Sequence, residues 1–251
     1  MLVLLDIGNT SVTYGVYSGG RIIFQSNIDH NRFPKKLSNC IKSGINSHDV
    51  TLIVSSVVPQ MTIKTIKIAR KYKELTIWIV GRDIEVKIKH KYRNINKLGI
   101  DRRVNIYGAL RIYKPPMLIL DYGTALTADY VSPKGVFEGG MIIPGPEIAF
   151  QALLQRAALI PKSFRLPTSR RSFLGQTTYD CIRSGILEGY GAMTDGLINR
   201  FKSRYGNRLR VLSTGGFLQH LKPYIKEAVT HDPSLSLKSL LLLYKSSRRK
   251  N

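Results

Sequence analysis

The sequence is short of cysteine and of long apolar runs. Its two cysteines, Cys40 and Cys181, are too few and too far apart for a disulfide framework or a zinc site, and both are expected to be small buried hydrophobes. The five histidines show no metal-ligand spacing. The densest apolar run, Leu240 to Leu243, is far shorter than a membrane span, so no membrane association is expected.

The first residues also lack the features of a secretion leader. The run Met1 to Leu5 has no basic start and is interrupted by Asp6, which is typical of a strand and not of a signal peptide. A cytoplasmic location is the resulting expectation. A hydrophobic content of 43% and a charged content of 22% indicate a soluble globular protein, and 251 residues are enough for two domains of about 120 residues each.

Acidic residues are scarce: 16 Asp and Glu stand against 39 Lys and Arg, a formal net charge of +23. Such a field attracts polyanions, so nucleic-acid binding is a real alternative function. The cations are nevertheless scattered along the chain and follow no nucleic-acid motif, which favours a solvated basic surface. They occur in groups at 35–36, 87–93, 102–103, 170–171 and 245–250, and the segment 245–251 is expected to be a frayed end.

One local design occurs twice. An apolar strand precedes Asp6-Ile7-Gly8-Asn9-Thr10, and another precedes Asp121-Tyr122-Gly123-Thr124-Ala125. A predicted β-hairpin follows each copy. The glycine lets backbone amides approach a phosphate, and the following polar side chains supply hydrogen bonds to its oxygens. One copy alone is ordinary turn chemistry, but two copies with the same flanking elements indicate a duplicated phosphate-binding fold.

The pattern between these motifs alternates between strands and helices. Expected strands lie at 52–54, 77–80 and 210–213, and expected helices at 34–44, 59–72, 103–113, 146–157, 178–201 and 217–224. Pro115-Pro116 ends a helix and divides the chain into an N-terminal domain, 1–115, and a C-terminal domain, 116–251. A third glycine loop, Thr214-Gly215-Gly216, follows the last of these strands. Because neither a P-loop nor a dinucleotide motif is present, the three loops predict a nucleotide held in a cleft between the duplicated halves.

Taken together, these motifs resemble the type III pantothenate kinases, within the superfamily of acetate and sugar kinases, Hsp70 and actin. The resemblance covers nearly the whole chain. It is carried by residues 6–10, 55–59 (Ser-Ser-Val-Val-Pro), 99–102 (Gly-Ile-Asp-Arg), 121–125, 139–145 (Gly-Gly-Met-Ile-Ile-Pro-Gly) and 214–216. It implies an α/β fold of two duplicated ribonuclease H-like (actin-like ATPase) domains, each with a mixed sheet flanked by helices.

The resemblance also implies an activity, which is ATP-dependent phosphorylation of the primary hydroxyl of pantothenate, the first step of coenzyme A biosynthesis. By similarity Asp101 is the catalytic base, and its carboxylate suits removal of the hydroxyl proton during in-line attack. The residues implied to bind pantothenate are Tyr92, Gly99, Ile100, Asp101, Arg102 and Thr178. Thr178 would reach the site from the second subunit of a homodimer, although Thr177 is an equally plausible choice.

The ATP-binding residues implied by the resemblance are Asp6, Ile7, Gly8, Asn9, Thr10, Ser11, Val12, Thr13, Thr124, Thr214, Gly215 and Gly216. Asp6 would position Mg²⁺, through water, and Asp121 would lie near the K⁺ or NH₄⁺ that the family requires. A hard, oxygen-lined site fits such a monovalent cation.

Two other functions are kept beside the kinase. One is a DNA-associated accessory regulator built on the same scaffold, which the positive charge favours. The other is a kinase of the same superfamily that acts on a different hydroxylated substrate. For individual residues simpler roles also exist: Asp101-Arg102 is a possible helix-start acid with a solvent-facing arginine, and Thr178 a possible helix cap.

Overall fold

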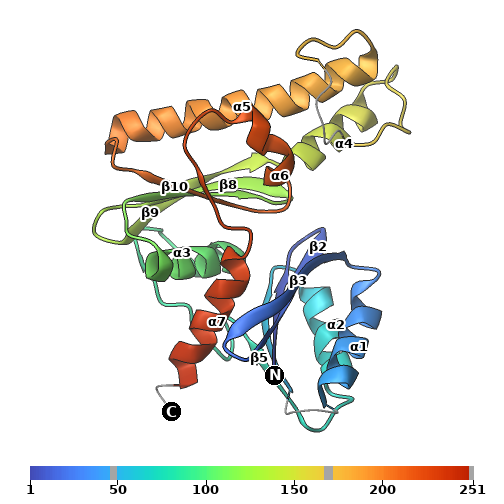
Figure 1. The fold of residues 1–251 in the computed structure, drawn as a ribbon, viewed down its shortest axis with the longest axis vertical. Coiled ribbons are helices and arrows are strands. Elements are labelled where there is room, and N and C mark those ends of the chain that lie inside the picture. The colour runs from blue at the N-terminus through green and yellow to red at the C-terminus, as the bar shows by residue number, and fades with distance from the viewer. Residues whose placement is uncertain (46–49, 167–171, 249–251) are drawn as a thin grey trace. The chain divides into compact units, whose positions relative to one another are not determined.

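The structure is a computed structural model, and it describes residues 1–45, 50–166 and 172–248 (Figure 1). The chain divides into two compact units, one made of Met1–Tyr113 with Ser234–Asn251 and the other of Lys114–Pro233. The basic pair Arg170-Arg171 and residues 249–251 lie outside the described residues. Within the described part of the chain, no helix is both long and apolar enough to span a bilayer.

A mixed five-stranded sheet forms the centre of the N-terminal unit, with the order β3-β2-β1-β4-β5. Its strands are β1 (Leu2–Ile7), β2 (Ser11–Ser18), β3 (Arg21–Asp29), β4 (Val50–Ser56) and β5 (Leu75–Ile79). β1 runs parallel to β4 and antiparallel to β2. The apolar run at the start of the sequence therefore occupies the middle of a sheet, where both of its faces are buried.

Helices cover both faces of this sheet. Val3, Leu5 and Ile7 pack with α1 (Phe33–Ile45) and α2 (Pro59–Ala69), because alternate side chains of a strand point to opposite faces. Leu4 packs on the other side with α3 (Ile100–Ile112) and α7 (Leu235–Arg248). Two short elements, β6 (Lys89–His90) and the 3₁₀ helix η1 (Ile95–Lys97), lie between β5 and α3 in the sequence.

The C-terminal unit repeats this plan, with the strand order β11-β10-β7-β8-β9. Its strands are β7 (Met117–Tyr122), β8 (Ala125–Val131), β9 (Val136–Pro144), β10 (Arg210–Thr214) and β11 (Thr230–His231). The remaining elements are α4 (Pro146–Arg156), α5 (Thr178–Tyr205), α6 (Leu218–Leu221) and the 3₁₀ helix η2 (Lys222–Tyr224). Buried side chains of α5 and α6 pack against alternate residues of β7 and form the core on one face.

The strand registers confirm the duplication that the sequence predicts. Asp6 pairs with Thr13 on the antiparallel neighbour and with Ser55 on the parallel one. Asp121 pairs in the same way with Thr127 and Thr214. Each acid therefore lies near the end of a central strand between two hydroxyl side chains, and the expected fold class of two mixed sheets flanked by helices is confirmed.

Three expectations differ from the structure. The helix expected at 103–113 begins at Ile100, so Asp101 lies in its first turn and not in a loop. The helix α7 was not expected, and Lys245 to Arg248 continue it instead of fraying. Because α7 packs on α3 and β1, residues 234–251 belong to the N-terminal unit, whereas the sequence division placed them in a domain 116–251.

Other predicted elements are close to the observed ones, with one local exception. The helix expected at 217–224 is one turn of α-helix followed by the 3₁₀ turn η2, because Pro223 has no amide hydrogen to extend it.

The two cysteines were expected to be buried. Cys181 is instead exposed on α5, and Cys40 is only partly buried.

Candidate functional site

The turn after β1 presents backbone groups more than side chains. Gly8 donates its amide to the carbonyl oxygen of Ser11 at 3.0 Å, which closes the turn. The side chains of Ile7 and Val12 are fully buried in the core, so these two predicted ATP-binding residues offer only their backbone. Asn9 and Thr10 at the tip are exposed, while Ser11 and Thr13 are partly buried. A tight turn with exposed polar groups of this kind suits an anion.

Asp6 is the most perturbed acid of this unit. Burial, and after it the negative charge of Asp101, raise the pKa of Asp6 to about 6, although a hydrogen bond with the hydroxyl of Ser236 acts in the opposite direction. The effect of Asp101 means that the two carboxylates, far apart in sequence, lie near enough to repel each other. A cation placed between such carboxylates would relieve this repulsion.

Asp101 is held at the start of α3 by the local backbone. Gly99 is the N-cap residue, and Asp101 Oδ1 accepts a hydrogen bond from the amide of Arg102 at 2.8 Å. A Cβ atom built on Gly99 would collide with that same Oδ1, so the glycine leaves the space the carboxylate occupies. Arg102 is only 8% exposed, which excludes the solvent-facing arginine considered from the sequence.

The turn after β1 has a side-chain contact that the sequence does not reveal. The Nε2 atom of His30, which follows β3, lies 2.9 Å from the carbonyl oxygen of Gly8. Since a carbonyl only accepts, the histidine donates this hydrogen bond and carries its proton on Nε2. The isolated His30 gave no signal in the sequence, because the two residues are brought together only by the β2–β3 hairpin.

Ser236 is the second missed residue, and it comes from α7. The first turn of α7 is fixed by Ser234, whose hydroxyl donates to Gln25 Oε1 at 2.5 Å, and by Leu237, whose Cδ1 would lie 2.7 Å from a Cβ atom on Gly15. One turn later, Ser239 packs so closely on Gly108 that a Cβ atom there would overlap its hydroxyl. These contacts hold α7 at the position from which Ser236 hydrogen-bonds to Asp6.

The C-terminal unit has its own cluster around the second acidic turn. Gly215, with φ +93°, passes so close that a Cβ atom would lie 2.6 Å from Asp121 Oδ1 and 2.5 Å from the backbone nitrogen of Tyr122. Gly145 donates its amide to the carbonyl oxygen of Thr124 at 3.1 Å. The structure thus brings Asp121 next to the loop 214–216 and Thr124 next to Gly145.

The structure shows which of Thr177 and Thr178 caps the helix α5. Thr177 is the N-cap of α5, accepting from the amide of Asp180 at 3.2 Å and donating to Asp180 Oδ2 at 2.9 Å. Thr178 is the first residue of the helix and is exposed. Tyr92, in the segment between β6 and η1, is partly buried. The cap role considered for Thr178 therefore belongs to its neighbour.

Within the described residues, no group of three or more His, Cys, Asp and Glu side chains is arranged to hold a metal ion. Asp6 and Asp101 make a pair only. This fits Mg²⁺ better than a metal caged by protein, because Mg²⁺ usually binds one or two carboxylates together with the phosphates of a substrate.

Comparison with known proteins gives a consistent result. Residues 2–200 match the type III pantothenate kinase family. The chain is 33% identical over 256 residues to the type III pantothenate kinase of Syntrophus aciditrophicus (strain SB), an alignment covering 98% of this chain and 99% of the relative.

Solved structures show the same fold at low identity. One is a conserved Baf family protein from Campylobacter jejuni named as a candidate transcriptional activator, with a TM-score of 0.59, 18% identity and coverage of 98% and 99% of the two chains. Another is MreB5 of Spiroplasma citri bound to ADP, with a TM-score of 0.52, 10% identity and coverage of 99% and 97%. At these identities the likeness concerns the fold alone.

Proposed function

Because the chain belongs to the type III pantothenate kinases, which phosphorylate pantothenate with ATP in coenzyme A biosynthesis, we propose roles in that reaction for its individual residues. The observation that carries the proposal is the interaction between Asp6 and Asp101. The negative charge of Asp101 raises the pKa of Asp6, and such a pair of carboxylates, one near the end of a central strand and one at the start of a helix, is typical of a site that handles a proton and a cation together.

Asp101 is proposed as the catalytic base. It accepts the proton of the pantothenate hydroxyl while that oxygen attacks the γ-phosphorus of ATP, so the O–H bond breaks as the new O–P bond forms. The hydrogen bond from the Arg102 amide and the contact with Gly99 fix the rotamer of its side chain. Its position in the first turn of α3 therefore orients the base before substrate arrives.

Asp6 is proposed to hold Mg²⁺, directly or through water. When bound, the metal supplies charge neutralisation for the phosphates. A carboxyl group whose pKa is raised to about 6 is largely ionised at neutral pH but at an electrostatic cost, and a cation removes that cost. The hydroxyl of Ser236 hydrogen-bonds to the carboxylate and stabilises its ionised form.

The turn that follows Asp6 is proposed to bind ATP phosphates. Gly8 and the polar residues Asn9, Thr10, Ser11 and Thr13 offer amides and hydroxyls, while Ile7 and Val12 hold the turn through their buried side chains. His30 supports the turn from outside through Gly8. In the C-terminal unit, Thr124 and the loop Thr214-Gly215-Gly216 are proposed to contact the nucleotide as well.

Pantothenate is proposed to bind at Tyr92, Gly99, Ile100 and Arg102. The guanidinium of Arg102 suits the substrate carboxylate because it offers two parallel N–H donors. Asp121 is proposed as the K⁺ or NH₄⁺ site. Its neighbours in the strand register, Thr127 and Thr214, carry hydroxyl oxygens of the kind that such hard cations prefer.

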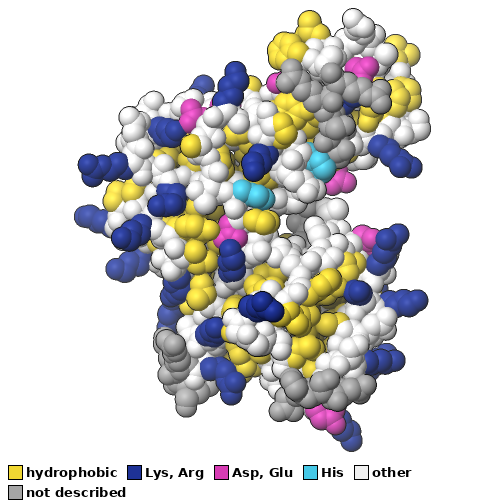
Figure 2. All heavy atoms as spheres, in the orientation of Figure 1, with side chains coloured by type: hydrophobic (Ala, Val, Ile, Leu, Met, Phe, Trp, Pro, Cys, Tyr) yellow, Lys and Arg dark blue, Asp and Glu magenta, His cyan; other side chains and the backbone are white. Residues whose placement is uncertain are grey.

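A homodimer is also proposed, with Thr178 contacting pantothenate from the partner subunit. The C-terminal unit exposes apolar side chains along β9, α4 and the segments next to α5, where Figure 2 shows yellow atoms at the surface. They are Met141, Ile142, Ile148, Leu153, Leu159, Phe173 and Leu174. Leu159 is 96% exposed. Such a set is unusual on a monomer and supports an interface between copies close to Thr178.

The test is a coupled phosphotransfer assay on pantothenate with ATP and Mg²⁺, with and without K⁺, on the wild type and on Asp101→Asn. The wild type is expected to consume ATP, and the variant to lose about 10²- to 10⁴-fold in kcat while still binding ATP. An Asp101→Asn protein that retains full activity would exclude Asp101 as the base. Activity that is the same with and without K⁺ would exclude the monovalent-cation role of Asp121.

A further inference from the structure

The two helices on one face of the N-terminal sheet carry positive charge without compensating acids. Residues 33–45 and 50–73 contain eight Lys and Arg and no Asp or Glu. All eight are exposed, and we call them the α1–α2 basic surface. They are Lys35, Lys36, Lys42, Lys64, Lys67, Arg70, Lys71 and Lys73. Such charges look scattered along the sequence, but the fold places five of these eight on α1 and α2, and the other three, Arg70, Lys71 and Lys73, directly after α2.

Helical spacing explains why these cations share a side. Lys35 and Lys42 are seven residues apart in α1, and Lys64 and Lys67 are three apart in α2, so each pair lies on one helix face. The opposite faces of both helices are buried against the sheet. α1 and α2 also pack on each other, and Figure 1 shows them side by side, so the sides that they turn to solvent are adjacent.

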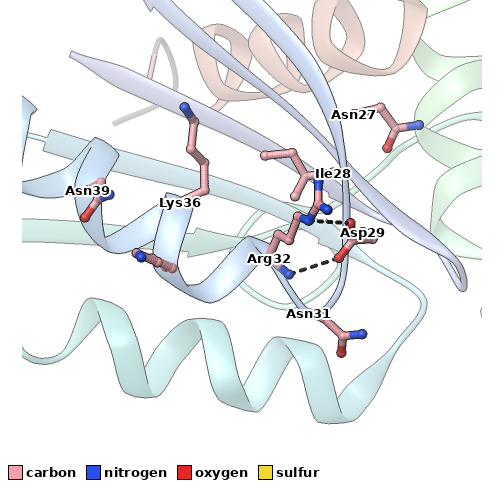
Figure 3. Close-up of a pocket in the computed structure, with 8 residues that line it drawn as sticks. Asn27, Ile28, Asp29, Asn31, Arg32, Lys36 and Asn39 are labelled. Carbon is pink, nitrogen blue, oxygen red and sulfur yellow. Dashed lines mark hydrogen bonds and ion pairs between the residues drawn. The ribbon is translucent and has the colours of Figure 1, made fainter.

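A hollow of about 550 Å³ opens at the start of α1, next to these cations (Figure 3). Its lining is basic and rich in carboxamides. The residues are Asn27, Ile28, Asp29, Asn31, Arg32, Lys35, Lys36 and Asn39. Arg32 is neutralised by Asp29, whose Oδ1 accepts from its amide at 3.0 Å and whose Oδ2 lies 3.6 Å from its Nε. Among the described residues, no ion pair joins Lys35 or Lys36 to an acid.

This hollow has the chemistry of a phosphate site. Two ammonium groups provide charge, and three carboxamides provide hydrogen-bond donors for phosphate oxygens. Among the described residues that line it, none is aromatic, so it offers no ring on which a base could stack. A ligand held here is therefore recognised by its phosphates and not by its bases.

We propose that the α1–α2 basic surface and the hollow beside it bind the phosphate backbone of duplex nucleic acid without regard to sequence. A row of cations spread over two neighbouring helices matches an extended polyanion better than a single small phosphate. The hollow at one end of the row takes a phosphate, and the lysines of α1 and α2 contact those that follow. This binding is separate from phosphotransfer, since none of these cations belongs to the proposed catalytic residues.

An anionic membrane is the competing partner for a basic surface. The helical layer offers it little to insert, because most large apolar side chains of α1 and α2 are turned into the core, with Ile63 as the exposed exception. Membrane-surface helices instead combine a basic face with an apolar face that is buried in lipid. The observations favour nucleic acid.

The experiment measures binding of a fluorescently labelled mixed-sequence DNA duplex by anisotropy at several salt concentrations. Wild type is compared with the triple variant Lys35→Gln, Lys36→Gln, Lys42→Gln. A control triple variant removes the same charge from exposed lysines of the C-terminal unit, by Lys134→Gln, Lys162→Gln and Lys222→Gln. The α1 variant is expected to bind at least about tenfold more weakly. Its log–log salt dependence should be shallower by about 0.9 for each phosphate that a lysine no longer neutralises.

The control triple variant is expected to bind nearly as tightly as wild type. Phosphotransfer should be unchanged in both triple variants, which also verifies that they fold. If the α1 variant does not fold, Lys64→Gln with Lys67→Gln on α2 replaces it, against Lys134→Gln with Lys222→Gln.

Three results would overturn the proposal. The first is an equal loss of affinity in the two variants, which would mean attraction by net charge alone. The second is no binding by wild type at physiological salt. The third is binding to anionic lipid vesicles, abolished in the α1 variant, by a protein that does not bind the duplex.

Discussion

His30 donates a hydrogen bond from Nε2 to the carbonyl oxygen of Gly8 at 2.9 Å, and it thereby fixes the turn after β1 from the far end of the neighbouring hairpin. The two residues are 22 positions apart in sequence. The carbonyl that His30 binds belongs to the same peptide segment whose amides are proposed to face ATP phosphates. Any loss of this bond therefore loosens the turn without removing a group that contacts the nucleotide.

Replacing His30 by alanine is expected to raise the KM for ATP about twofold to tenfold and to leave the KM for pantothenate almost unchanged, because one neutral hydrogen bond is removed. His30→Gln, whose side-chain amide also donates, is expected to restore most of the affinity. Steady-state kinetics with each substrate varied in turn is the measurement. Equal effects on both substrates would contradict a role confined to the turn after β1.

The burial of Asp6 has a consequence for stability. Because its pKa is raised to about 6 from 3.8, the folded protein binds a proton that the unfolded chain has released between these pH values, and stability falls as the pH rises through this window. Asp6→Asn removes the electrostatic cost of the buried negative charge and is expected to increase the free energy of unfolding at neutral pH by about 1–3 kcal/mol.

Urea unfolding of Asp6→Asn and of wild type at about pH 4 and pH 7.5 tests this, and the advantage of the variant should be larger at the higher pH. Mg²⁺ should stabilise wild type and not the variant. A variant less stable than wild type at neutral pH would show that Asp6 is instead stabilised by a partner.

Ser236, on α7, is expected to influence the pH dependence of the reaction through the pKa of Asp6. Its hydroxyl lowers the pKa of the Asp6 carboxyl, so Ser236→Ala should raise that pKa further and move the acidic limb of the pH–rate profile to higher pH. Activity at about pH 6 should fall about threefold to tenfold, with a smaller loss at alkaline pH. Ser236→Thr should keep the wild-type profile.

A second variant on the same helix separates this effect from damage to α7. Ser247 donates its hydroxyl to the carbonyl oxygen of Tyr244 at 2.8 Å, far along the helix from Asp6. Ser247→Ala is expected to leave the pH profile unchanged. The same shift in both serine variants would point to a general disturbance of helix packing.

Gly215 is predicted to tolerate no side chain. Its φ of +93° is unfavourable for other residues, and a Cβ atom would also press on Asp121 and Tyr122. Gly215→Ala should therefore cost about 2–4 kcal/mol of unfolding free energy. Gly206 is the matched control, because it has φ +96° but open space around it, and Gly206→Ala should cost about 1 kcal/mol. Equal losses in urea unfolding would mean that backbone strain alone explains both.

The local patterns of the sequence predicted much of the fold. Runs such as Leu2 to Leu5 specify buried strands wherever they lie in a chain, and the two Asp-x-Gly turns placed Asp6 and Asp121 correctly near strand ends. The helix α7 was missed because Leu235-Ser236-Leu237 alternates like a strand. The helix packs against α3, a contact that no local pattern records.

The sequence predicted a site residue only where that residue belonged to a recognisable motif. The segment Gly99 to Arg102 was found as a unit, although its helical start was assigned three residues late. His30 and Ser236 had no motif, and each acquires its role from a partner that is distant in sequence. Tertiary contacts of this kind depend on the fold as a whole and leave no spacing to recognise.

The packing of α7 on the N-terminal unit also bears on how the protein is made. A ribosome completes residues 1–113 before it makes any of residues 114–233, and α7 comes after both. Until then Leu4, Ile53 and Val104 lack the leucines that cover them, and Asp6 lacks the hydroxyl of Ser236. The first unit to be synthesised is therefore the last to be finished, and a stalled or shortened chain would leave the turn after β1 on an incompletely covered sheet.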